Sequence, residues 1–281
     1  MKEITGTTRI FPVIGWPVEQ VKAPTLFNAY FRHHDLDARV IPFKIEPERY
    51  CEAVRMFMKT ENVGGIFVSI PHKPMTLDAV EQATLRARVA GACNAVYRDA
   101  DGVVWGDLID GEGFIRALAR TAADRPLVWN KTRALVVGTG GVGCAIVASL
   151  AAQGVAEISV FDTHRAGAEA LLARVEAAYP ATRVRFAPPD ASGVDLLVNC
   201  TPLGMHAGDP MPFALEGVSA GAIVADCGMK IEMSQLLVQA RAKGCRIQKG
   251  KEMLIEQAPL YLELFGWPGV AADDFRHLEA L

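Results

Sequence analysis

The feature that most constrains this chain is a glycine-rich turn between an apolar strand pattern and a helix pattern. Residues 134–137 are Ala-Leu-Val-Val, and a GxGxxG pattern follows them directly. In a dinucleotide-binding fold the first glycine permits the tight turn, the second lets a pyrophosphate approach, and the third lets helix and strand pack closely. The N–H groups at the start of the helix then bind the phosphates. The predicted dinucleotide-binding residues of the turn are Gly138, Thr139, Gly140, Gly141, Val142 and Gly143. A glycine turn that binds nothing is the alternative.

Strand and helix patterns alternate along the rest of the chain. The expected strands are 10–15, 38–43, 65–70, 134–137, 158–161, 183–186, 196–199 and 223–226. The expected helices are 24–33, 47–59, 144–153, 166–178, 234–243 and 251–265, with a further helix ending near 120. Such alternation is typical of βαβ units and mostly parallel sheets. We therefore expect an α/β protein of two domains. Residues 1–111, completed by the C-terminal helix within 248–281, form an α/β substrate domain, and residues 112–247 form a Rossmann-type domain.

Charge and cysteine spacing exclude several classes of protein. A net charge of −3 and a pI near 6.1 provide no basic field for nucleic acid or an anionic membrane. No stretch approaches the roughly 20 apolar residues of a membrane span, and residues 1–9 are too polar for a secretory signal. The six cysteines lie far apart with no CxxC pair, as expected of reduced thiols. We expect a cytoplasmic protein without a metal site.

An acidic residue ends the strand that follows the glycine turn. Asp162 lies about 20 residues beyond the GxGxxG pattern, where a carboxylate accepts hydrogen bonds from the adenosine ribose hydroxyls. The same charge repels a 2′-phosphate, so Asp162 favours NAD over NADP. Arg165 points the other way, because it could turn inward to meet a phosphate. A turn aspartate without a ligand is the third interpretation.

A lysine and an aspartate are candidates for the reaction chemistry. Lys73 lies just beyond an expected buried strand, in Ser-Ile-Pro-His-Lys, and Asp110 lies in a second loop. A lysine paired with a carboxylate can hold an alcohol oxygen and move its proton while a hydride leaves carbon for nicotinamide. Taken singly, each is more often a solvated loop charge.

Six motifs together resemble the shikimate dehydrogenase family. The lysine motif, the family's GAxNT segment, the second half of its GxNTDGxG, its glycine turn, its NxTPxGM loop and its late GxxMLxxQ occur in this order. They occupy residues 69–73, 91–95, 110–113, 138–143, 199–205 and 250–257. The resemblance covers almost the whole chain. It implies a two-domain α/β enzyme with the cofactor between the domains.

The resemblance also implies roles for individual residues. Lys73 and Asp110 would form the catalytic pair. The substrate would contact Ser69, Asn94 and Gln257. The cofactor site would extend beyond the glycine turn to Asp162, Thr163, Arg165, Thr201, Leu203, Cys227 and Gly250. The loop at 199–205 also fits an ordinary connection between two elements.

The chain departs from the family where substrate is recognised. Family members carry a Ser-x-Ser pair whose hydroxyls bind the shikimate carboxylate, and here Val21 and Ala23 replace both. Each lost hydrogen bond to a charged group costs about 1.5–3 kcal/mol, so two losses weaken carboxylate binding roughly a hundredfold or more. We expect a substrate less polar than shikimate at that end, or one held by Lys22 or Glu19.

Further changes run in the same direction. The residues that replace polar family side chains are Ala95, Leu108, Ile109 and Met229. An apolar wall leaves substrate hydroxyls unpaired and discriminates against them.

Two hypotheses of different classes follow. The first is a dehydrogenase that uses NAD to oxidise a secondary alcohol to a ketone, with a substrate other than shikimate; residual shikimate or quinate turnover falls within it. The second is a dinucleotide-binding sensor or interaction protein with little turnover. The retention of Lys73 and Asp110 favours the first. The expected partner is a small alcohol or ketone, and the resemblance implies a monomer or a homodimer.

Overall fold

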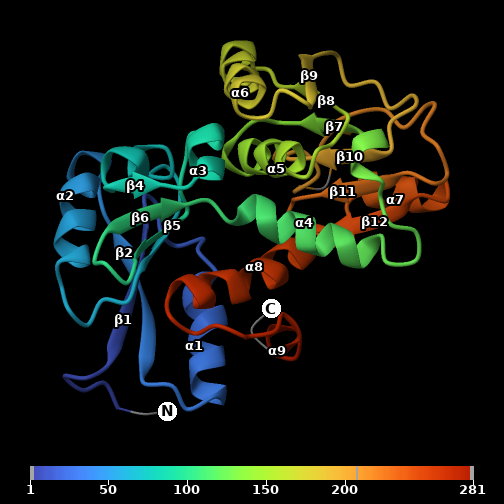
Figure 1. The fold of residues 1–281 in the computed structure, drawn as a ribbon. Helices are drawn as coiled ribbons and strands as arrows, with labels where there is room; N and C mark the ends of the chain where they lie inside the picture. Colours follow the sequence, from blue (N-terminus) through green and yellow to red (C-terminus); the bar gives the residue numbers. More distant parts are fainter. Residues whose placement is uncertain (1–2, 207, 279–281) are drawn as a thin grey trace. The chain divides into compact units, whose positions relative to one another are not determined.

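The computed structural model describes residues 3–206 and 208–278, which form two compact units. The first unit comprises Met1–Ile109 and Gln257–Leu281, and the second comprises Asp110–Glu256. In Figure 1 the first unit is blue to green with a red C-terminal segment, and the second runs from green to red. The sequence predicts boundaries at 111/112 and 247/248. Whether the units are independent domains stays a prediction.

The first unit is built on a six-stranded sheet of order β2-β1-β3-β5-β6-β4. Its strands are β1 (Arg9–Gly15), β2 (Ala38–Lys44), β3 (Ile66–Val68), β4 (Gln82–Ala83), β5 (Ala95–Arg98) and β6 (Val104–Asp107). Its helices are α1 (Ala23–His33), α2 (Pro47–Met58), α3 (Leu85–Ala90) and α9 (Asp273–Arg276), with a 3-10 turn η1 (Met75–Asp78). Strand β1 pairs in parallel with β2 and β3, whereas β5 is antiparallel to β3 and β6. The five-residue link between β5 and β6 explains the last pair, because parallel neighbours need a longer crossover.

Aromatic side chains join the C-terminal segment to the first unit. Phe265 stacks on Phe11 of β1 at 5.0 Å and meets Phe67 of β3 edge-on at 5.1 Å. Tyr261 packs edge-on against Phe27 of α1 at 5.9 Å. Rings at these separations add stabilisation beyond the area that they bury. The described residues 257–278 therefore help to complete the core of the first unit.

The second unit is a doubly wound sheet of order β12-β11-β10-β7-β8-β9, with all neighbours parallel. Its strands are β7 (Arg133–Val137), β8 (Glu157–Phe161), β9 (Arg183–Phe186), β10 (Leu196–Asn199), β11 (Ile223–Asp226) and β12 (Arg246–Lys249). Its helices are α4 (Asp110–Thr121), α5 (Gly141–Ala152), α6 (Arg165–Ala178) and α7 (Gln235–Ala242), with η2 (Trp129–Lys131); α8 (Gly250–Leu264) begins in it. This is the strand order of dinucleotide-binding folds, so the predicted fold class is confirmed. The chain reverses direction across the sheet between β7 and β10, and ligands bind at the carboxyl ends of strands at such a switch point.

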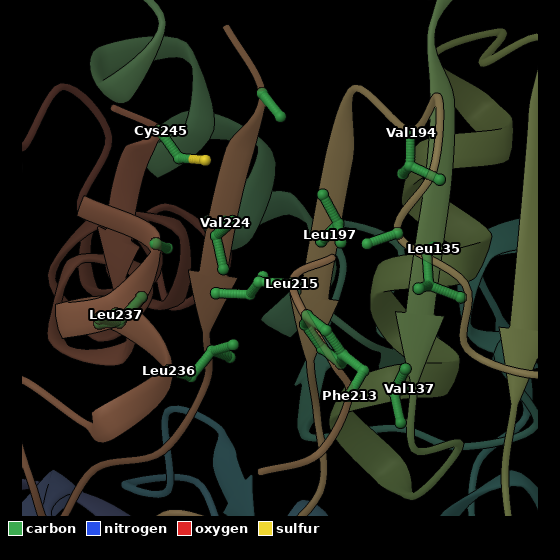
Figure 2. Packing of buried hydrophobic residues seen from close by; sticks show 13 residues of the cluster. Leu135, Val137, Val194, Leu197, Phe213, Leu215, Val224, Leu236, Leu237 and Cys245 are labelled. Carbon is green, nitrogen blue, oxygen red and sulfur yellow. The ribbon is translucent and has the colours of Figure 1, made fainter. Parts of the chain in front are cut away.

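One face of this sheet is covered by a continuous apolar cluster. Figure 2 shows Phe213 and Leu215 lying among the side chains of strands β7, β10 and β11, represented by Leu135, Leu197 and Val224. Helices cover both faces of a parallel sheet, so its strands read as apolar runs without alternation. The cluster buries this face of the three strands.

Candidate active site and dinucleotide site

Two glycines of the turn after β7 are required by the protein's own packing. Gly138 has a φ of +95°, and its N–H donates to the Phe161 carbonyl at 2.8 Å. A Cβ at Gly138 would lie 2.8 Å from the carbonyl carbon of Cys200, and one at Gly143 would overlap the Gly138 carbonyl oxygen. Both positions exclude larger residues because the turn packs tightly against the loop after β10.

Gly140, the second glycine of the pattern, leaves space beside the start of helix α5. Gly140 is the N-cap of α5 with a φ of −65°, and a Cβ there would meet no described atom within 4 Å. Packing within the unit therefore does not require glycine at 140, whereas a pyrophosphate against the backbone does. The first N–H groups of α5, which include Gly141 and Val142, point out of the helix end and favour an anion. The turn fits the phosphates of a dinucleotide.

Asp162 uses its carboxylate to hold this turn. Its Oδ2 accepts from the backbone N–H of Thr139 at 2.5 Å and from the Thr139 hydroxyl at 2.8 Å, while Oδ1 accepts from the His164 N–H at 2.7 Å. Burial opposes ionisation, but the bonds from Thr139 and His164 outweigh it and lower the pKa of Asp162. The carboxylate is thus used for hydrogen bonds within the protein, as expected for an aspartate that stabilises a turn.

The other predicted residues of this segment lie at the surface. Thr163 is exposed. Arg165 begins α6, donates to Glu169 at 2.7 Å, and lies over the Phe186 ring at 5.0 Å from its centre. An exposed ion pair of this kind contributes little to stability, so Arg165 can exchange Glu169 for another anion.

A hydrogen-bonded network shapes the loop after β10. Asn199 Oδ1 accepts from the Thr201 N–H at 3.0 Å and from the Thr201 hydroxyl at 2.7 Å. That hydroxyl accepts from the Leu203 N–H at 3.1 Å, and Asn199 Nδ2 donates to the Leu203 carbonyl at 3.0 Å. Thr201 and Leu203 therefore lie in a loop whose conformation is set by the protein alone.

Asp226 extends the network to the loop after β11. It accepts from Asn199 Nδ2 at 3.1 Å, from the Gly228 N–H at 2.9 Å and from the Ser234 hydroxyl at 2.5 Å. Neither Asn199 nor Asp226 was among the predicted site residues, although each is the last residue of a buried strand. The sequence does contain a signal for both residues: each is a polar residue at the end of an apolar run, which places it at the carboxyl edge of the sheet.

Gly250 closes this edge at the start of α8. A Cβ at Gly250 would lie 2.5 Å from the Gly228 carbonyl oxygen and 2.9 Å from the Cys227 carbonyl carbon. The predicted cofactor residues Cys227 and Gly250 are thus in close backbone contact. Gly138, Gly143, Thr201, Leu203 and Asp162 lie in the same unit, at the carboxyl ends of its strands.

The first residues of α4 pack closely on α5 in the same unit. A Cβ at Gly111 would overlap the Ala145 carbonyl and the Ser149 hydroxyl. Asp110, the first residue of α4, is buried. The close packing of Gly111 fixes the backbone of the predicted catalytic carboxylate.

In the first unit, the loop after β3 carries Ser69 and Lys73. The Ser69 N–H donates to the Ile14 carbonyl at 2.8 Å, and the Lys73 carbonyl accepts from the Cys93 N–H at 2.8 Å. His72 between them is buried, stacks on Tyr50 at 4.4 Å, and bonds the Ile45 carbonyl through Nε2 at 2.9 Å. Burial lowers the pKa of His72, so its ring stays neutral. The loop backbone beside Lys73 is therefore anchored on both sides.

Asn94 is a buried polar residue of this region. It is 1% exposed, its carbonyl accepts from the Val68 N–H at 2.8 Å and from the Tyr261 hydroxyl at 3.2 Å, and its Oδ1 accepts from the Ile109 N–H at 3.0 Å. Among the residues that the structure describes, Nδ2 is buried and has no acceptor. An unpaired buried donor is costly, which makes it a candidate to bind a ligand oxygen.

Asp107 clamps the segment that leads toward Asp110. Its carboxylate accepts from Arg86 Nε at 2.7 Å, from the Thr84 hydroxyl at 2.6 Å and from the Leu108 N–H at 2.7 Å. Its carbonyl accepts from the Asn94 N–H at 2.8 Å. Asp107 is not among the predicted site residues, because its partners Thr84, Arg86 and Asn94 are distant in the chain.

The remaining predicted substrate residues differ in exposure. Gln257 is buried in α8, and Lys22 is exposed at the N-cap of α1, where it forms no side-chain cap. Val21 and Ala23, which replace the two family hydroxyls, are half-buried. Leu108, Ile109 and Ala95 are fully buried, whereas Met229, in the other unit, is 43% exposed.

The described residues provide neither a metal-binding cluster nor a membrane-spanning helix. In residues 3–206 and 208–278 no group of three or more His, Cys, Asp or Glu side chains is placed to hold a metal ion. Within the same residues, no helix has the length and apolar character needed to cross a membrane.

Comparison with known proteins shows what this chain resembles. The sequence profile described as "Shikimate dehydrogenase substrate binding domain" matches residues 13–96. A protein of Geobacter metallireducens named shikimate dehydrogenase (NADP(+)) is 34% identical over 275 residues, covering 95% of this chain and 94% of that protein. A Rhodospirillum rubrum protein of the same name is 33% identical, covering 96% and 95%. Among solved structures, shikimate 5-dehydrogenase from Listeria monocytogenes in complex with shikimate and NAD has a TM-score of 0.89 and 25% identity, covering 98% of each chain.

These names correct one expectation. The sequence analysis favoured NAD because of Asp162, and this prediction is wrong: the relatives at 33–34% identity are named for NADP(+). A preference for NAD through Asp162 requires its carboxylate to face the ribose. In the structure both of its oxygens accept hydrogen bonds from the residues around the turn.

Proposed function

Because the chain belongs to the shikimate dehydrogenase family, and is therefore a shikimate dehydrogenase-like oxidoreductase acting on CH–OH groups, we propose that it interconverts a secondary alcohol and a ketone with NADP as cofactor. The names of the relatives support NADP. The exposed Arg165 at the start of α6 is the cation that we assign to the 2′-phosphate, in exchange for Glu169.

The observation that carries this proposal is the unpaired amide donor of Asn94. A buried N–H group without an acceptor costs about 1–3 kcal/mol, and a hydroxyl or carbonyl oxygen of the substrate would relieve that cost. The Asn94 side chain cannot turn away without losing the Ile109 bond to its Oδ1. Ser69 and Gln257 are proposed as further substrate contacts, on the strength of the family motifs alone.

Lys73 is proposed to act on the reacting oxygen. Its ammonium group donates a hydrogen bond to that oxygen and delivers the proton when a ketone is reduced; in the oxidation it receives the proton back. Asp110 is proposed to orient the lysine and to stabilise its charged form. When bound, the nicotinamide supplies or accepts the hydride. The anchored backbone on either side of Lys73 favours a fixed position for this group.

The second unit is proposed to hold the cofactor. The turn Gly138–Gly143 would bind the pyrophosphate through backbone N–H groups, and the space beside Gly140 supports this assignment. The prearranged loops that carry Thr201, Leu203, Cys227 and Gly250 would bind the nicotinamide half, largely through backbone groups.

We further propose that the substrate is not shikimate. Val21, in the loop before α1, and Ala23, the first residue of α1, stand where family members use two hydroxyls for the carboxylate. Neither side chain can donate a hydrogen bond, and an unpaired carboxylate would lose about 1.5–3 kcal/mol per missing bond. We infer a cyclic or short-chain alcohol without a carboxylate at that end, or one whose carboxylate pairs with the exposed Lys22.

The test is a turnover assay that follows nicotinamide absorbance with NADP and with NAD. Shikimate, quinate and cyclic alcohols that lack the carboxylate are compared, each with its ketone in the reverse direction. We expect turnover with a decarboxylated alcohol to exceed turnover with shikimate. We also expect Arg165→Ala to lower the affinity for NADP more than the affinity for NAD. Binding of NADP without turnover of any alcohol would favour the sensor hypothesis instead.

A further inference from the structure

Two thiols face each other at the carboxyl edge of the second unit. Cys200 follows β10 and Cys227 follows β11, and their sulfur atoms are 3.8 Å apart. The strands are parallel neighbours with Asn199 and Asp226 as register partners, and the Cys227 N–H donates to the Asn199 carbonyl at 2.9 Å. The two cysteines therefore occupy equivalent positions at the ends of adjacent strands.

This placement suits a covalent bond between the two sulfurs. Neighbouring strands lie about 4.8 Å apart, and disulfides join residues whose Cα atoms are about 4.4–6.8 Å apart. Side chains at equivalent positions of neighbouring strands point to the same face of a sheet. The sulfurs need only close from 3.8 Å to the bond length of about 2.0 Å.

Burial and neighbouring thiols affect the cysteines at this edge of the unit. Cys200 and Cys227 are both partly exposed. The hydrogen bond with Cys227 and burial raise the pKa of Cys200 well above its usual value, so Cys200 keeps its proton. The neighbouring Cys144 donates to the Thr139 carbonyl at 3.0 Å, and burial raises its pKa to about 11. The 3.8 Å separation leaves the sulfurs of Cys200 and Cys227 within reach of each other.

We propose that Cys200 and Cys227 form a reversible disulfide when the protein meets hydrogen peroxide. The Cys227 sulfur attacks one peroxide oxygen, the O–O bond breaks, and a sulfenic acid and one water form. The Cys200 sulfur then attacks the Cys227 sulfur, the S–O bond breaks, and the thiol proton leaves with the hydroxyl as a second water. In sum, two thiols and one peroxide give one disulfide and two waters.

The disulfide would alter cofactor binding, a consequence that rests on the proposed function. Cys227 touches the backbone of Gly250, and the Cys200 backbone packs against Gly138. Drawing the sulfurs together shifts both loops at the edge assigned to NADP. We expect the affinity for NADP to fall about tenfold, a typical size for coupling between two binding events.

The chemical step is tested on the full chain without any assay of activity. The protein is treated with hydrogen peroxide, remaining thiols are blocked, and the digest is examined by mass spectrometry. We expect loss of two of the six free thiols, a peptide linked through Cys200 and Cys227, and full reversal by dithiothreitol. Cys144→Ser is the matched control, because it removes the third nearby thiol and should retain the linked peptide.

Several results would overturn the proposal. These are a linked peptide that joins Cys144 to either thiol in place of the proposed pair, irreversible oxidation of Cys227 alone, and thiols that resist peroxide. Since the wild-type protein is mapped directly, no variant has to fold for the test to decide. Cys227→Ser should leave Cys200 as a free thiol after the same treatment.

The effect on the cofactor is measured separately by equilibrium binding of NADP to reduced and oxidised protein. A tenfold weaker affinity that dithiothreitol restores supports the coupling, and equal affinities of the two forms contradict it. If the reduced protein does not bind NADP, the proposed function fails while the disulfide result stands on its own.

Discussion

The backbone N–H of Ile109 donates a 3.0 Å hydrogen bond to Oδ1 of Asn94, and this bond determines which way the Asn94 amide faces. Because Oδ1 is held, the Nδ2 group is the part of the side chain left for a ligand. No acceptor for it lies in the part of the chain that the structure describes. The bond therefore links the segment before Asp110 to the orientation of a proposed substrate contact.

Replacing Asn94 by alanine should reduce activity by more than the loss of stability explains. The Ile109 N–H loses its acceptor, which costs about 1–3 kcal/mol of unfolding free energy. The substrate loses its amide contact, so kcat/KM per folded molecule should fall about tenfold or more. Urea unfolding and steady-state kinetics measure the two effects.

The matched control is Asn28→Ala in the same unit. Asn28 also bonds through both side-chain atoms, donating to the Val40 carbonyl and accepting from the Val40 N–H. It should lose similar stability and keep its kcat/KM per folded molecule. Equal kinetic losses in both variants would show that Asn94 has only a structural role.

Replacing Lys73 by alanine should abolish turnover while leaving cofactor binding intact. General acid–base groups contribute about 10²- to 10⁴-fold to rate, so kcat should fall by that factor. The affinity for NADP should stay within about twofold, because the assigned cofactor residues belong to the second unit. Stopped-flow kinetics and equilibrium binding test this, with the exposed Lys59→Ala as control. Wild-type turnover in Lys73→Ala would remove the assigned chemistry.

Two glycine-to-alanine changes in one turn should affect different properties, cofactor affinity in one case and stability in the other. The added methyl group of Gly140→Ala meets none of the described atoms within 4 Å, and residue 140 has an ordinary φ, so the melting temperature should hardly change. The affinity for NADP should fall about tenfold or more, because the methyl group occupies the pyrophosphate space. Gly143→Ala overlaps the Gly138 carbonyl and should destabilise the fold by several kcal/mol. Thermal melts and NADP titrations measure both. An unchanged NADP affinity in Gly140→Ala argues against the assigned phosphate site.

Asp162 should make the glycine turn sensitive to acid. The pKa of Asp162 is lowered in the folded protein. The stability that Asp162 provides is therefore fully present above the pKa of the unfolded chain, about 3.9, and is lost as the pH falls through the folded-state pKa. Asp162→Ala should lower stability at neutral pH and lessen this acid dependence. The replacement should also lower the affinity for NADP, because Thr139 in the glycine turn loses its hydrogen-bond acceptor. Urea unfolding across acidic pH checks this, and parallel curves for the two proteins would contradict it.

Restoring two hydroxyls should restore recognition of a carboxylate. Val21→Ser combined with Ala23→Ser supplies two donors, each contributing about 1.5–3 kcal/mol to a charged acceptor. The kcat/KM for shikimate should therefore rise roughly a hundredfold relative to a decarboxylated alcohol. Val18→Ser, in the same loop, is the control. If the wild-type protein already turns over shikimate as fast as the double variant, the proposed substrate class is wrong.

Local patterns in the sequence predict the fold class and the longer strands and helices. The strand, glycine turn and helix from Ala134 to Ala152 follow from apolar runs, φ preferences and helix propensity, all of which act over a few residues. The short strands β4, β5, β6 and β12 were not predicted. They have two to four residues each, and their pairing comes from neighbours in the sheet rather than from periodicity.

The sequence by itself determined the doubly wound α/β architecture, the position of the glycine turn and the family motifs, because these depend on residue types at short spacings. Only the tertiary structure decided how the polar atoms are used. It assigned the Asp162 carboxylate to Thr139, left the Asn94 amide donor unpaired, and set Cys200 against Cys227. Each donor or acceptor has few bonding directions, and the partner that fills them is the one folding brings closest, whatever its distance along the chain.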